Sequence, residues 1–135
     1  MDPPDIVAAR IRAGGFDGSP ETPASLARLL ADAARAHESG VTALEDALCA
    51  HVGALLRSGD SRLVGLALTH IDVQARAGAP VGLTLVREAY ASVESAEWSA
   101  WAAREADTAT PLREEVLLVA DQAARRIASG TCGAG

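Results

Sequence analysis

The sequence contains no lysine and no asparagine, so its twelve cationic side chains are all arginine. Both missing residues have A-rich codons, and their absence favours a GC-rich genome and a bacterial source. Cysteine is also scarce, with only Cys49 and Cys132 among 135 residues. Two isolated cysteines exclude a disulfide framework and a zinc site of the CxxC type. A reducing cytoplasm is therefore the expected location.

Long hydrophobic runs are missing as well. No apolar run approaches the roughly 18 residues of a membrane helix, and residues 1–12 lack the apolar centre of a signal peptide. The formal charge is −6. An acidic balance argues against nucleic acids, which are bound through Lys/Arg clusters, and against anionic membrane surfaces. We therefore expect neither a nucleic-acid nor a membrane partner.

Strand-like alternation is absent, and helix start and stop signals repeat instead. Thr22 precedes Pro23 and Thr110 precedes Pro111, an order that suits the first turn of a helix. Glycine readily adopts the left-handed conformation that ends helices. Such glycines close the successive segments at Gly40, Gly59, Gly78 and Gly130.

Apolar residues recur at helical spacing between these signals. A segment from Val81 either continues to Glu105 or breaks near Ser95, where the apolar phase shifts by about one residue; the shift favours a break. We predict an all-α, compact bundle of five or six short helices with antiparallel hairpins, formed by residues 1–128 and followed by a disordered tail, 129–135. Phe16 is expected to plug the core. A first short helix is expected to end near Ala13. The other expected helices cover residues 23–38, 43–57, 62–77 and 111–128.

The four-residue turn at 58–61 is too short for anything but an antiparallel hairpin between its flanking helices. One contiguous core is therefore expected across that hairpin. Its predicted members are Leu48, Val52, Val64, Leu68 and Ile71.

Residues 55–68 read LLRSGDSRLVGLAL, with Asp60 at the turn and Arg62 just after it, ahead of an Ala/Leu-rich helix. This stretch resembles a HEAT-type helical hairpin. The resemblance implies a short HEAT-like α-solenoid as the alternative fold. HEAT arrays repeat at about 40–47 residues, and no second copy appears at that period, so the bundle is preferred.

The net charge is concentrated in one segment that also holds both tryptophans. Between Glu88 and Asp121 lie eight acids and two arginines, which accounts for the whole charge of −6. Trp98 and Trp101 are three residues apart and share one helical face. Indole faces attract cations, and Trp is frequent in interface hot spots.

We therefore predict a non-enzymatic protein-interaction or adaptor module that binds a basic partner through this face. The prediction requires at least one exposed indole, and Trp98 is expected to be the more exposed of the two. The alternative is that both indoles fill the core. The predicted partner-binding residues are Trp98, Trp101, Glu94, Glu97 and Glu105.

A second hypothesis is a small enzyme or a ligand- or metal-binding protein that uses Cys49 and His70, which the hairpin register places level with each other. A thiol beside an imidazole forms a nucleophile or a soft metal site. His51 projects about 200° away from Cys49, so both cannot face His70. A core role for Cys49 is favoured, and no catalytic residue, metal or cofactor is expected.

A third hypothesis is a helix-turn-helix regulator, with residues 78–80 as the turn. Its recognition helix would present Gly82, Thr84 and Arg87 outward, but one arginine is a poor phosphate footprint. Finally, Ala-rich helix faces allow close approach between chains. A homodimer is therefore expected.

Overall fold

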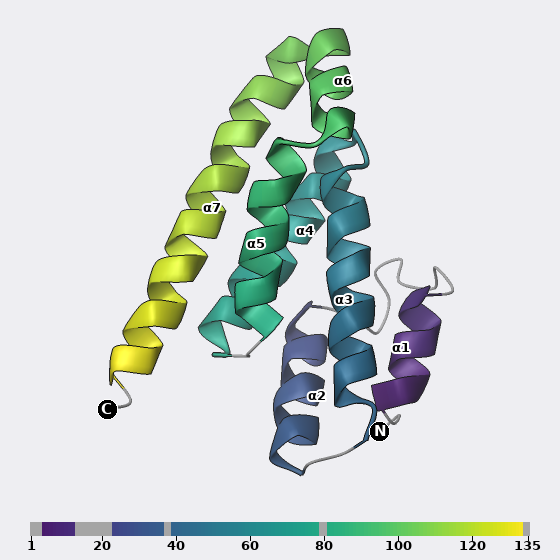
Figure 1. Ribbon diagram of the computed structural model, residues 1–135, viewed down its shortest axis with the longest axis vertical. Helices are drawn as coiled ribbons and strands as arrows, with labels where there is room; N and C mark the ends of the chain where they lie inside the picture. The colour runs from purple at the N-terminus through teal and green to yellow at the C-terminus, as the bar shows by residue number, and fades with distance from the viewer. Residues whose placement is uncertain (1–3, 13–22, 37–38, 79–80, 134–135) are drawn as a thin grey trace.

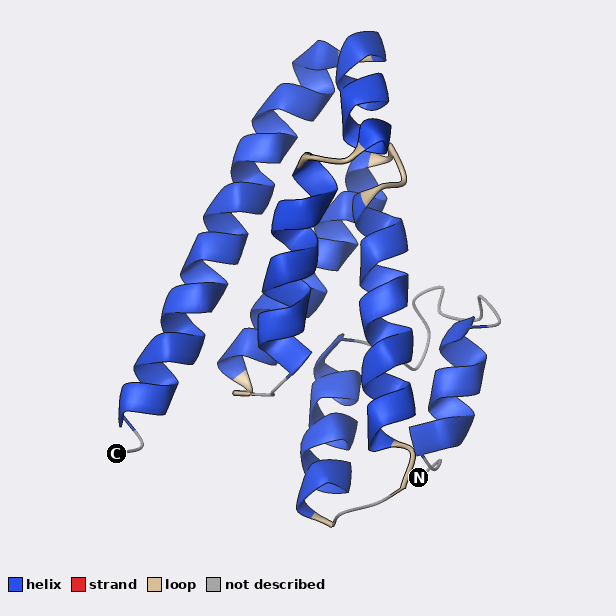
Figure 2. Cartoon of the chain, viewed as in Figure 1, coloured by secondary structure: helices blue, strands red, loops and turns tan. Residues whose placement is uncertain are grey.

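The computed structural model describes residues 4–12, 23–36, 39–78 and 81–133, which form seven helices and no strand (Figures 1 and 2). The predicted all-α bundle is confirmed. Phe16 and the last two residues of the chain lie outside the described ranges. The helices are α1 (Pro4–Arg12), α2 (Pro23–Arg35), α3 (Val41–Leu56), α4 (Ser61–Arg76), α5 (Val81–Val93), α6 (Ala96–Arg104) and α7 (Ala106–Gly133).

The α3–α4 hairpin forms as the short turn predicts. Gly59 has a φ of 71°, a left-handed conformation that glycine adopts without steric cost. Asp60 then caps α4 by accepting a hydrogen bond of 2.9 Å from the backbone N–H of Arg62. The predicted core across this hairpin is confirmed, because all five of its predicted members are buried in one cluster.

The segment that begins at Val81 is broken into α5 and α6. Ser95 has extended backbone angles, and its hydroxyl accepts a hydrogen bond from the backbone N–H of Trp98. A serine in this position caps the new helix and ends the old one. The break that the phase shift favoured is therefore confirmed.

The last helix is longer than predicted at both ends. It begins at Ala106 rather than at the Thr110–Pro111 pair, so Pro111 lies inside it. The backbone N–H groups of Thr108 and Ala109 both bond to the Glu105 carbonyl, which starts the helix ahead of the proline. α7 then continues to Gly133, whereas the sequence predicted a tail from Ser129.

The helices pack on neighbours that are distant in sequence. α7 runs along α4 and α5 and also contacts α6, while α3 packs against α1, α4 and α5 (Figure 1). In a solenoid each repeat contacts only the next one, so this arrangement is a bundle and not the HEAT-like alternative. None of the described helices is both long and apolar enough to cross a membrane.

Candidate functional site

Both tryptophans are buried. Trp98 is 3% exposed and Trp101 is 1% exposed, and their rings meet edge to face with centroids 4.9 Å apart. The expectation of at least one accessible indole is therefore wrong. The short helix α6 turns both rings toward the α3–α4 turn, where Trp98 contacts Leu56 and Trp101 lies near Gly59.

The two indoles cover that turn. The Nε1–H of Trp98 donates a hydrogen bond of 2.6 Å to the carbonyl oxygen of Leu56, the last residue of α3. The last four carbonyls of a helix lack partners within it, so this bond satisfies one of them. A side chain at Gly59 would begin 3.8 Å from the ring of Trp101, which shows how closely Trp101 packs on the turn.

The three predicted carboxylates lie on the outside of the same region. Glu94, Glu97 and Glu105 are all exposed. Glu94 pairs with Arg113 at 3.3 Å, and Glu105 accepts a hydrogen bond of 3.1 Å from the indole N–H of Trp101. The structure thus places the five predicted residues together, with the indoles turned inward and the carboxylates outward.

The sequence-based site omitted three more acids of this region: Asp107, Glu114 and Glu115, which are exposed on the first ten residues of α7. We call α6 and this part of α7, residues 96–115, the acidic hairpin. The early start of α7 brings Asp107 onto a helix that packs against α6. The number of acids between Glu88 and Asp121 could have indicated these residues from the sequence. The helix start predicted at residues 110–111 left Asp107 outside the helix, so its place beside α6 was not predicted.

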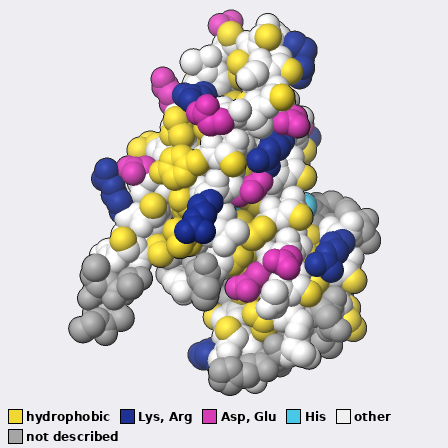
Figure 3. All heavy atoms as spheres, viewed as in Figure 1, with side chains coloured by type: hydrophobic (Ala, Val, Ile, Leu, Met, Phe, Trp, Pro, Cys, Tyr) yellow, Lys and Arg dark blue, Asp and Glu magenta, His cyan; other side chains and the backbone are white. Residues whose placement is uncertain are grey.

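Arginines compensate only part of this charge. Glu88, Glu94 and Asp121 each pair with an arginine. Figure 3 shows acidic and arginine side chains interspersed over the upper part of the molecule, with hydrophobic atoms exposed between them. Within the described ranges, the acids of the segment that form no ion pair are Glu97, Glu105, Asp107, Glu114 and Glu115.

The turn of the acidic hairpin is hollowed. An open depression of about 390 Å³ lies there. Among the described residues, its charged lining is Arg104 with the carboxylates of Glu105 and Asp107, beside the hydroxyl of Thr108. The depression is therefore acidic and open to solvent.

The Cys49 thiol is not poised for nucleophilic chemistry. Burial, followed by the charges of Asp46, Glu45 and Glu88, raises the pKa of Cys49 to about 11. A reactive cysteine requires the opposite shift, because the thiolate is the nucleophile.

The ring of His70 lies against the ring of His51. His70 is fully buried on α4, and the two rings meet edge to face, with centroids 6.1 Å apart. His51 and Cys49 are two positions apart on α3 and project in different directions. Burial, and then the neighbouring His51, lowers the pKa of His70 to about 4. Among the described residues, no group of three His, Cys, Asp or Glu side chains is arranged to hold a metal ion.

The predicted recognition helix is only partly exposed. Thr84 and Arg87 face outward, but Gly82 is buried against Ala75 and Ile127. α5 packs against α3, α4, α6 and α7, and its exposed residues are Leu83, Thr84, Arg87, Tyr90 and Ala91. The expectation of an outward Gly82 is wrong.

In comparisons with known proteins, no family model, no curated protein and no solved structure matches the chain.

Proposed function

We propose that the protein is a non-enzymatic interaction module whose acidic hairpin binds a basic segment of a protein partner. One observation carries the proposal: five carboxylates in residues 96–115 are exposed and form no ion pair within the described part of the chain. Repulsion among like charges disfavours such a surface in the free protein. A cationic partner relieves that repulsion on binding.

The tryptophans support this surface from beneath. Trp98 anchors α6 to the end of α3, and Trp101 holds Glu105 through its indole N–H. A rigid presentation lowers the ordering cost that the carboxylates incur when a partner binds. The indoles thus position the acidic hairpin without contacting the partner.

The depression at the hairpin turn suits a guanidinium or an ammonium. A cation there would meet the carboxylates of Glu105 and Asp107, and an arginine fork is matched to carboxylate oxygens. An exposed ion pair contributes only about 0.2–1 kcal/mol. Several must form together, so we expect a partner segment with several basic residues and an affinity that falls with added salt.

The test measures the binding of a fluorescent arginine-rich peptide by anisotropy. Replacing Glu114 and Glu115 by Gln should weaken binding about two- to fivefold for each charge removed, given the worth of an exposed pair. The matched control is Asp46→Asn, an exposed acid on α3 outside the acidic hairpin. Unchanged binding by the Glu114→Gln/Glu115→Gln protein, or equal weakening in the control, would contradict the proposal.

A homodimer is a further part of the proposal, supported by the exposed apolar side chains of α5 and α7. Leu83 and Tyr90 lie seven residues apart and share one face of α5, and Leu118 is 56% exposed on the adjacent α7. Burying such side chains between two copies would remove them from water. Sedimentation should show a concentration-dependent dimer that Leu118→Glu abolishes; a wild-type monomer at every concentration would rule it out.

A further inference from the structure

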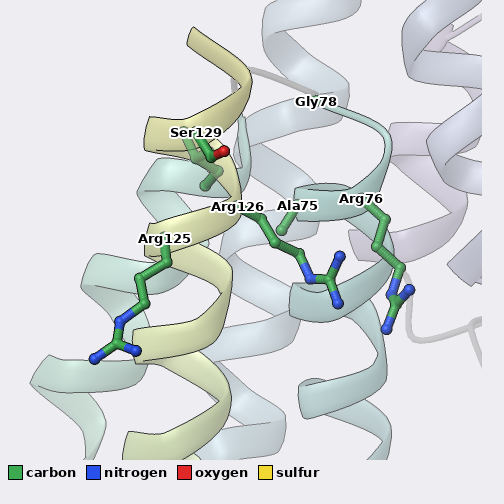
Figure 4. Close-up of a pocket in the computed structure, with 7 residues that line it drawn as sticks. Ala75, Arg76, Gly78, Arg125, Arg126 and Ser129 are labelled. Carbon is green, nitrogen blue, oxygen red and sulfur yellow. The ribbon is translucent and has the colours of Figure 1, made fainter. Parts of the chain in front are cut away.

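A basic hollow lies far along α7 from the acidic hairpin. It occupies about 690 Å³ between the end of α4 and the last third of α7 (Figure 4). Three arginines line it, Arg76 from α4 and Arg125 and Arg126 from α7, together with the hydroxyl-bearing Ser129. None of the described residues that line it carries a carboxylate.

Arg76 runs along the side of α4 that faces away from α7 in Figure 4, so it reaches the hollow from the α4 side. In Figure 4, Arg126 extends from α7 toward the side on which Arg76 lies, whereas Arg125 points away from α4. The backbones that carry Arg76 and Arg126 are held in place by the packing of α4 against α7. The hollow therefore presents two guanidinium groups from two fixed helices.

Neighbouring carboxylates neutralise only part of this charge. Arg76 pairs with Asp72 at 2.8 Å, and Arg125 pairs with Asp121 at 3.0 Å. Arg126 forms no ion pair within the described ranges. The helix dipole favours a cation in the last turn of a helix, which accounts for Arg76, but Arg126 lies seven residues before the end of α7 at Gly133.

The chemistry of the lining favours a phosphate group. Guanidinium forks bind phosphate oxygens through paired, charge-assisted hydrogen bonds. A tetrahedral phosphate offers oxygens in several directions, which suits donors that approach from two helices and from the Ser129 hydroxyl. A carboxylate offers two oxygens in one plane and would engage one fork.

The volume and the apolar lining of the hollow indicate the chemistry of the rest of the ligand. Its volume falls in the roughly 300–1,000 Å³ range of small-molecule sites. Ala75 and Ile127 supply an apolar lining, and none of the described lining residues has an aromatic ring on which a nucleobase could stack. We propose that this hollow binds a phosphorylated small molecule with an aliphatic body, clamped by Arg76 and Arg126.

The first measurement is calorimetric titration with inorganic pyrophosphate and with glycerol 3-phosphate at constant ionic strength. Wild-type protein should bind both. A hydrogen bond to a charged group contributes about 1.5–3 kcal/mol, so Arg126→Gln and Arg76→Gln should each weaken binding at least about tenfold. Arg62→Gln is the matched control, an arginine of α4 whose side chain is 88% exposed and lies outside the hollow.

Three outcomes would overturn the proposal: no heat at millimolar ligand, unchanged affinity in Arg126→Gln, or equal losses in all three variants. The last would mean attraction by overall charge. Because Arg126 is exposed, its replacement should leave the melting temperature unchanged. Arg126→Gln should also leave binding of the arginine-rich peptide intact, which separates this site from the acidic hairpin.

Discussion

The indole N–H of Trp98 bonds to the carbonyl oxygen of Leu56, a residue 42 positions earlier in the chain. This bond joins α6 to the C-terminal end of α3. It makes the tryptophan a structural link between the α3–α4 turn and the acidic hairpin, so the charge on the outside of the hairpin depends for its placement on a contact in the core.

Removing that bond while keeping a ring should lower the free energy of unfolding. In Trp98→Phe the Leu56 carbonyl loses its donor in a buried place, which costs about 1–3 kcal/mol in addition to the smaller ring volume. Urea denaturation measures the loss. Thr84→Ser, at an exposed side chain on α5, is the control and should change stability little. Equal stability of Trp98→Phe and wild type would contradict the structural role.

Local patterns predicted most of the fold. The turn at 58–61 and the apolar stripes around it predicted the α3–α4 hairpin, and the phase shift at Ser95 indicated the break between α5 and α6. These features depend on neighbours in sequence. Residue spacing therefore predicts the hairpin and the helix break without knowledge of the tertiary contacts.

The orientation of the tryptophans was not predictable in this way. Trp98 and Trp101 share a face of α6, but whether that face meets water or the α3–α4 turn depends on contacts 42 residues away. The start of α7 was misplaced for a related reason. Pro111 suits a first turn, yet the backbone bonds at Glu105 start the helix earlier and the proline is carried within it.

The hairpin core should respond strongly to a cavity. Leu68 is 5% exposed and packs in the same cluster as Val52 and Ile71. Leu68→Ala should lower the free energy of unfolding by about 2–5 kcal/mol, the range for buried Leu→Ala changes. A chemical melt provides the value, with Ile6→Ala, at a side chain 51% exposed on α1, as the control; a loss below about 0.5 kcal/mol would show that Leu68 is not part of the core.

Stability should fall as the pH drops from about 6.5 to about 4. The pKa of His70 is lowered to about 4 in the fold, while an unfolded histidine titrates near 6.5. The unfolded chain therefore binds a proton first, and up to about 3 kcal/mol of stability is lost across that window. Burial also lowers the pKa of His51, with the same sign.

Replacing His70 by Leu isolates this contribution. The variant should have a flatter dependence of the unfolding free energy on pH between about 6.5 and 4, because one titrating group is gone. Identical slopes for the variant and the wild type, measured by urea melts at a series of pH values, would show that His70 is already accessible to protons in the fold.

Cys49 should alkylate slowly in the native protein. Its pKa of about 11 leaves very little thiolate at neutral pH, and the side chain is only partly exposed. Iodoacetamide labelling followed by peptide mass spectrometry should show a rate at Cys49 well below that of free cysteine, restored in urea. Native labelling as fast as free cysteine would revive the enzyme hypothesis.

The placement of the indoles is tested most directly by tryptophan fluorescence, because Trp98 and Trp101 are the only two tryptophans of the chain. With both rings buried beneath the acidic hairpin, native emission should be blue-shifted from that of free tryptophan and weakly quenched by acrylamide, and saturating arginine-rich peptide should leave both properties unchanged. Red-shifted emission with quenching close to that of free tryptophan, or strong protection from quenching on peptide binding, would place an indole on the binding surface and contradict the account.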